Sequence, residues 1–193
     1  VGVSVASVAG AALALTMHGG DVVSLEQRIR AALEANRDEE AGTLVDRGLA
    51  LHPSEPIFAL SGAELAVRQK DPAAARWLNA AQSLAPLWTA PHLLAARWLF
   101  SIGKTDQALV ELREAESLQS GSARQTICSL LRQARDPTIA FRTAPEGAAG
   151  VQLLDRSAAC LPLQSPAAIA IDEEARRLDP TAIGPATRQA RRL

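Results

Sequence analysis

Residues 55–88 read EPIFALSGAELAVRQKDPAAARWLNAAQSLAPLW, and the same pattern recurs on both sides of this segment. The copies begin at Val22, Glu55 and Thr89, so the intervals are 33 and 34 residues (22 to 55 and 55 to 89). The matching columns hold Ile29, Gly62 and Ala96; Ala41, Ala74 and Ala108; Val45, Leu78 and Leu112; Gly48, Ala81 and Ala115; and Pro53, Pro86 and Ser120. Small residues in three columns allow two helices to pack closely, and the apolar column fills the space beside them. The period therefore predicts stacked helical hairpins.

This arrangement resembles the tetratricopeptide repeat, a helix–turn–helix unit of about 34 residues. In that family a small residue stands at place eight, alanine at twenty, a small residue at twenty-seven and proline at thirty-two. The middle unit fits best and has Phe58 in the large aromatic column, where the other units have Leu25 and His92. The resemblance covers residues 22–120 as three units. It implies an all-α fold, a right-handed solenoid of tetratricopeptide hairpins.

Local signals place the helix boundaries. We expect helices at about 24–36, 39–51, 56–70, 72–84, 91–102 and 105–119. Asp38 and Asp71 are expected N-caps, Pro72 is expected in a first turn, and Gly103 is expected to end the fifth helix. Over residues 121–193 the spacing is lost, and we expect a degenerate repeat and a capping helix. The expected helices there are 124–135, 148–160, 166–178 and 181–193, with 138–146 as a connection.

The N-terminal residues 1–17 contain no charged side chain and no proline. A bilayer crossing needs about 20 apolar residues. Residues 1–18 are therefore interpreted as the end of a transmembrane helix that starts upstream, with a signal-peptide segment and a buried capping helix as alternatives. Asp21 and Glu26 precede any basic residue, which favours a periplasmic or extracellular position for the repeats.

Composition limits the function. The chain is 48% hydrophobic and 21% charged, as expected for a globular protein, and its net charge of −1 argues against a nucleic-acid partner. His18, His52 and His92 are far apart, and no zinc-protease, phosphate-loop or nucleophile-elbow motif is present. We therefore expect no catalytic residue, no cofactor and no metal in this chain, and no enzyme activity of its own.

Charged residues near the C-terminus are interpreted as surface features. Asp172 with Arg176, and Glu173 with Arg177, have the i,i+4 spacing of ion pairs on an exposed helix face. The remaining basic cluster, Arg188, Arg191 and Arg192, is interpreted as the solvated last turn of a helix.

Two cysteines, Cys128 and Cys160, leave two alternatives open. In an oxidising compartment they could form a disulfide, and otherwise they are small buried hydrophobic residues. The second interpretation is favoured, because sequence alone does not bring their Cα atoms within bonding range.

The resemblance also implies a concave groove lined by the first helix of each unit. The candidate partner-binding residues are Glu26, Arg30, Ala59, Ala63, Leu93, Arg97 and Phe100. An apolar centre with charged edges suits an extended or helical peptide with small apolar anchors. The Lys and Asn residues that the chaperone-tail-binding subgroup requires are absent from this set.

Two hypotheses follow for the function. The first is a membrane-tethered, non-catalytic module that binds a partner protein or peptide and helps to assemble an envelope complex. The second is the C-terminal accessory domain of a polytopic membrane enzyme, similar to the tails of some O-antigen polymerases or ligases. The sequence leaves the partner and the oligomeric state open.

Overall fold

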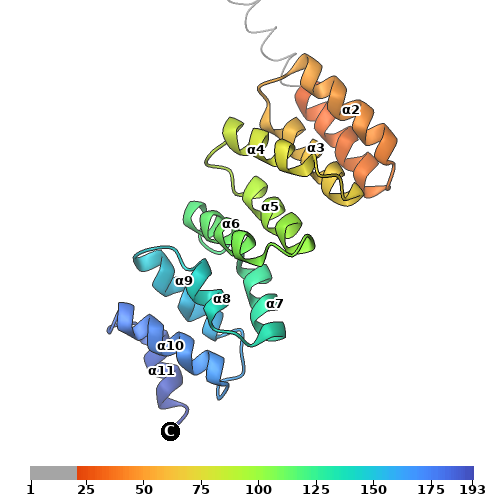
Figure 1. Cartoon of the computed structure of the whole chain (residues 1–193). Coiled ribbons are helices and arrows are strands. Elements are labelled where there is room, and N and C mark those ends of the chain that lie inside the picture. Colours follow the sequence, from red (N-terminus) through yellow and green to blue (C-terminus); the bar gives the residue numbers. More distant parts are fainter. Residues whose placement is uncertain (1–20) are drawn as a thin grey trace, which may run out of the picture. The chain divides into compact units, whose positions relative to one another are not determined.

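The computed structural model describes residues 21–193, and within that range every regular element is a helix (Figure 1). The predicted all-α fold of helical hairpins is confirmed. The expected transmembrane segment at 1–18 lies outside the described residues. Between residues 21 and 193 no helix has the length and apolarity that a membrane crossing requires.

The helices follow the repeat closely. Their bounds are residues 21–34 for the described part of the first, then α2 Asp38–Leu51, α3 Pro56–Gln69, α4 Ala74–Leu84, α5 Thr89–Ser101, α6 Thr105–Leu118, α7 Arg124–Ala134, α8 Thr138–Thr143, α9 Ala148–Ala158, α10 Pro166–Leu178 and α11 Ile183–Ala190.

Three of the four expected boundary signals act differently from the prediction. Asp38 is the first residue of α2 and not its cap, so its charge lies in the first turn, where the helix dipole favours an anion. The Asp71 carboxylate accepts a hydrogen bond from the Ala73 amide at 2.8 Å, which closes a turn that contains Pro72 and precedes α4. Gly103 ends α5 as predicted, with a positive φ of 75°.

The expected connection at 138–146 contains a short helix, α8. Its start is organised by Asp136, whose carboxylate accepts hydrogen bonds from the Thr138 hydroxyl (2.7 Å) and the Thr138 amide (2.9 Å). These two bonds stabilise the ionised form and lower the pKa of Asp136. The same Asp-Pro-Thr sequence recurs at Asp179, where bonds from the Thr181 hydroxyl and amide precede α11 and again lower the aspartate pKa.

By packing, the chain divides into a first unit that ends at Pro86 and a second unit, Leu87–Leu193. We call these unit 1 and unit 2. The predicted ranges 22–120 and 121–193 follow the repeat pattern and not this division, and they stay predictions.

Unit 1 is built around Phe58, whose side chain is fully buried. Gly48 lies against this ring so closely that a Cβ at position 48 would be 2.4 Å from Phe58 Cδ1. Gly62 likewise lies against Trp77, where an added Cβ would be 3.0 Å from the indole. The small-residue columns therefore do what the repeat predicts: they let a large ring from the neighbouring helix fill the space.

Unit 2 begins with the α5·α6 hairpin and continues through α7 to α11. Helix α6 packs on α8, α9 forms a hairpin with α10, and α11 covers α10 (Figure 1). Its most deeply buried side chains include Leu112, Ile127, Leu131, Leu154 and Ile171. The buried Glu116 carboxylate accepts hydrogen bonds from the Gly121 and Ala123 amides, each at 2.7 Å, and so fixes the turn into α7.

Candidate functional site

The candidate groove residues of unit 1 differ in accessibility. Arg30 is exposed, and its guanidinium pairs with Glu26 at 2.5 Å along the same helix. Ala59 and Ala63 are 1% and 0% exposed, so their side chains belong to the packing of α3. Within unit 1 the accessible part of the predicted set is therefore the Glu26–Arg30 pair.

The candidate groove residues of unit 2 lie on α5. Leu93, Arg97 and Phe100 are spaced four and three residues apart, which places them on one face of the helix. Leu93 and Phe100 are half-buried against the core, whereas Arg97 is exposed. Within residues 21–193 the Arg97 side chain makes no hydrogen bond or ion pair. We call these three residues the α5 face; its role in binding stays a prediction.

Next to this face, His92 explains why the aromatic column tolerates a polar residue. Its Nδ1 lies 2.8 Å from Glu111 Oε2 on α6, and both side chains are largely buried. The polar pair joins the two helices of the hairpin at the position where Phe58 packs in unit 1.

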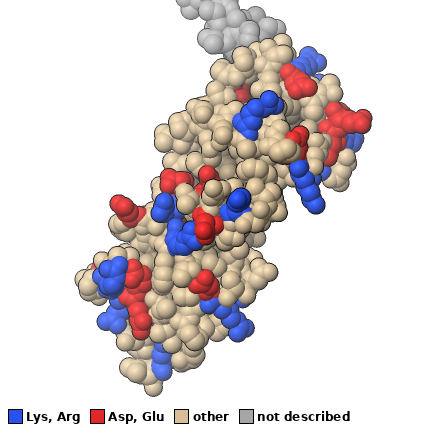
Figure 2. Space-filling model, viewed as in Figure 1, with Lys and Arg blue, Asp and Glu red and all other residues tan. Residues whose placement is uncertain are grey.

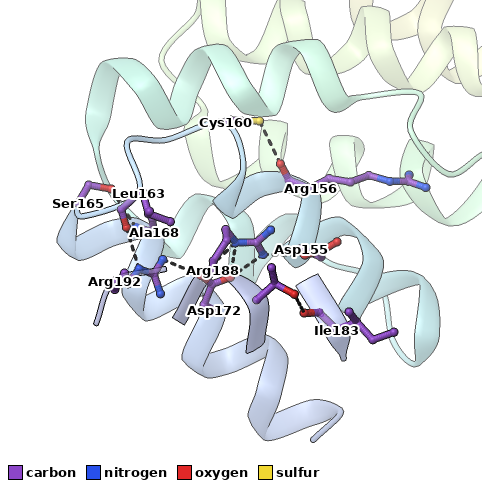
Figure 3. A network of polar contacts seen from close by, with 11 residues as sticks. Asp155, Arg156, Cys160, Leu163, Ser165, Ala168, Asp172, Ile183, Arg188 and Arg192 are labelled. Carbon is purple, nitrogen blue, oxygen red and sulfur yellow. Dashed lines mark hydrogen bonds and ion pairs between the residues drawn. The ribbon is translucent and has the colours of Figure 1, made fainter. Parts of the chain in front are cut away.

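A buried charge network at the C-terminal end of unit 2 corrects two interpretations of the sequence (Figure 3). The Asp172 side chain is only 3% exposed, and Arg188 and Arg192 each donate to it at 2.6 Å. Arg188 also donates to Asp155 Oδ1 at 2.6 Å. Asp172 is thus not on a solvated face, and these two arginines are not a solvated last turn. The bound arginines lie on and just after α11, so the network fastens that helix to α9 and α10.

The surface ion pairs differ from the predicted ones as well. Arg177 pairs with Glu174, three residues earlier, and not with Glu173. Arg176 donates to Gln189 and not to Asp172. The bond from Arg177 lowers the pKa of Glu174.

The geometry around Arg188 is tight and electrostatically closed. Burial disfavours the charge on Arg188, but hydrogen bonds to Asp172 and Asp155 outweigh it and raise the pKa of the guanidinium. Gly184 permits the approach, since a Cβ there would be 2.0 Å from Asp155 Oδ1. The network is therefore structural, and over residues 21–193 no group of three potential metal ligands occurs.

The favoured interpretation of the cysteines as unpaired is wrong. Cys128 of α7 and Cys160, just after α9, form a disulfide with a Cα–Cα distance of 5.5 Å. The two residues are 32 positions apart, and the packing of α7 on α9 brings them together.

A surface hollow of about 850 Å³ lies beside this disulfide, and no pattern in the sequence indicated it. It is lined by Arg132, Arg135, Cys160, Leu161, Pro162, Gln164, Ser165, Pro166 and Ala167. Elsewhere acidic and basic side chains are interspersed on the face shown in Figure 2.

These features define an all-α repeat protein with the fold of the tetratricopeptide class. No protein-family model matches the chain, and no curated protein matches it in sequence. Among solved structures, PilF of Pseudomonas aeruginosa is similar with a TM-score of 0.51 at 16% identity, over 90% of this chain and 99% of that one. This likeness is one of fold.

Two further structures show weaker similarity. The TPR domain of P58(IPK) has a TM-score of 0.44 at 18% identity, over 93% of this chain and 57% of that one. The flexible tandem repeat domain of a bacterial cellulose synthase has a TM-score of 0.35 at 15% identity, over 87% and 94% of the two chains.

Proposed function

We propose that this chain is a non-catalytic scaffold that binds a protein or peptide partner and helps to assemble an envelope complex. The observation that carries the proposal is the α5 face, where the exposed Arg97 lies between the half-buried Leu93 and Phe100. A charged group beside partly accessible apolar groups gives a partner both orientation and buried area.

The polar interior of the described chain supports a binding role over a catalytic one. Its two buried carboxylates are fully engaged: Glu116 holds a turn, and Asp172 holds α11. A catalytic carboxylate or base would instead face an open site where substrate could approach it. The surface is thus the part of the molecule that is left to act.

The proposal is tested by site-specific photocrosslinking in the source cells, with the crosslinking residue placed at position 97. We expect a discrete adduct there and none from the same residue at position 124, an exposed site on α7. In a binding assay with the purified partner, Arg97→Glu should weaken affinity about tenfold while Arg124→Glu changes it little. Equal adducts at both positions, or equal affinities of both variants, would contradict the α5 face. Leu93→Asp is unsuitable alone, because Leu93 packs against the core.

We further infer a location outside the cytoplasm, with attachment to a membrane through the segment at 1–18. The Cys128–Cys160 disulfide supports this location, because cytosolic thiols are normally kept reduced. Protein recovered from cells quenched with acid should therefore resist a thiol-reactive polyethylene glycol and take up two labels only after reduction. Labelling of both cysteines before reduction would place the chain in a reducing compartment. A Cys128→Ser/Cys160→Ser variant serves as the unlabelled control.

The accessory-domain alternative differs in what precedes Val1. Several charge-free segments of about 20 residues upstream would assign the chain to a polytopic membrane enzyme. One such segment, completed by residues 1–17, would support a singly anchored scaffold.

A further inference from the structure

The hollow beside the disulfide has two walls that come from different parts of unit 2. One is the C-terminal end of α7, where Cys128, Arg132 and Arg135 follow at intervals of four and three residues and so share a face. The other is the segment 160–167, which leads from α9 into α10. The Cys128–Cys160 bond joins the two walls directly, and Arg132 Nε donates to the Cys160 carbonyl at 3.3 Å. The shape of the hollow is therefore held by a covalent link.

The lining of the hollow is apolar with a positive edge. Leu161, Pro162, Pro166 and Ala167 form its apolar part. Arg132 and Arg135 are both exposed, no acidic residue lines the hollow, and neither guanidinium has a carboxylate within ion-pair distance in the described range. This sets the two arginines apart from Arg142, Arg177, Arg188 and Arg192 of the same unit, which all have acidic partners.

The size of the hollow suits side chains of a bound segment. Ligand sites typically enclose about 300–1,000 Å³, and this hollow falls within that range. Arg132 and Arg135 are three residues apart, so along the helix axis their backbones are separated by about 4.5 Å. Two neighbouring carboxylates of one peptide can therefore reach both guanidiniums while an apolar side chain between them enters the hollow.

We propose that this hollow docks an acidic segment of a partner protein that carries apolar side chains between its carboxylates. The apolar side chains contact Pro162 and Pro166, and the carboxylates pair with Arg132 and Arg135. Charge complementarity selects this occupant, since a basic segment would meet two unneutralised arginines and a neutral one would leave them unpaired. The site uses residues outside the α5 face and goes beyond the function proposed above.

The test measures fluorescence anisotropy of a labelled, amidated peptide, EELLEE, titrated with the full chain in its disulfide-bonded form. We expect saturable binding that weakens as salt is raised, because part of the attraction is between exposed charges. The double variant Arg132→Glu/Arg135→Glu should lose about tenfold or more in affinity. Arg132→Lys/Arg135→Lys should retain most of it, which shows that a loss in the first variant comes from charge.

The matched control is Arg124→Glu/Arg191→Glu, which changes the net charge of unit 2 equally at two exposed arginines that make no side-chain contact in the described chain. It should change affinity less than about twofold. Equal loss in both double variants, or equal binding of the peptide EESSEE, would overturn the site in favour of general charge attraction. No binding of EELLEE would also overturn it.

Two more measurements distinguish the docking of an acidic segment from self-association and from binding at the α5 face. Sedimentation velocity of the wild type and the Arg132→Glu/Arg135→Glu variant tests whether the hollow instead binds a second copy, and a dimer lost only in the variant would overturn the proposal. Arg97→Glu should leave EELLEE affinity unchanged. A failure at the α5 face and a failure at the hollow are therefore seen in different variants.

Discussion

Replacing Asp172 with alanine should lower the free energy of unfolding of unit 2 by about 3–5 kcal/mol, the usual cost of removing one partner from a buried ion pair. The Asp172 side chain is 3% exposed and pairs with two arginines. Arg188 retains Asp155 in the variant, but Arg192, 10% exposed, loses its carboxylate partner and stays close to the core. The uncompensated charge, and not the lost bond alone, makes the effect large.

Hydrogen exchange followed by mass spectrometry measures this effect where it arises, in peptides from α9, α10 and α11. Protection should fall most in α11, because the network holds that helix in place. Glu174→Ala is the matched control: it removes a carboxylate of the same helix from the surface pair with Arg177 and should cost about 0.5 kcal/mol or less. Similar losses from both variants would show that Asp172 is not a buried partner in solution.

The role of Asp172 was hidden from sequence reasoning because its partners lie 16 and 20 residues further on. The i,i+4 rule considers only neighbours on one helix, so it selected Arg176. A signal was nevertheless present. Ala168, Ile171 and Ala175 form the buried stripe of α10, and Asp172 is four residues from the first of them and three from the last. A charged residue inside an apolar stripe indicates a distant counterion.

The cysteines and the groove met the same limit in different forms. Cys128 lies with Ile127 and Leu131 on the buried face of α7, so its burial was predictable, but its pairing depends on how α7 meets the end of α9. For the groove, place numbers within the repeat identified α3 correctly as a first helix. They did not indicate that Ala59 and Ala63 would be buried, because accessibility depends on the neighbouring helices.

The hairpins themselves were predictable because their determinants are contacts between adjacent helices. Gly48 and Phe58 are ten positions apart and meet across the turn between α2 and α3. Gly62 and Trp77 meet across the next turn in the same way. A pattern of small and large residues thus specifies which faces pack, without reference to anything far along the chain.

This contact yields the second large effect: Phe58→Ala should destabilise unit 1 by about 3–5 kcal/mol, as expected when a fully buried ring is removed. Gly48→Ala should cost about 1–3 kcal/mol, because its new Cβ would overlap the ring at 2.4 Å. Gly42→Ala is the control in the same helix. Its Cβ would meet Leu65 at an ordinary 3.5 Å, so the higher helix propensity of alanine should stabilise the unit by up to about 1 kcal/mol.

The double variant Gly48→Ala/Phe58→Ala tests the contact itself. Once the ring is gone, the methyl group at position 48 enters the vacated space, so the double variant should lose less than the sum of the single losses. We expect a coupling of about 1–3 kcal/mol, the range found for residues in direct contact. Urea unfolding followed by hydrogen exchange in α2 and α3 gives the three values. Strict additivity would mean that the glycine column does not accommodate the aromatic ring, and the physical basis for the repeat in unit 1 would then have to lie elsewhere.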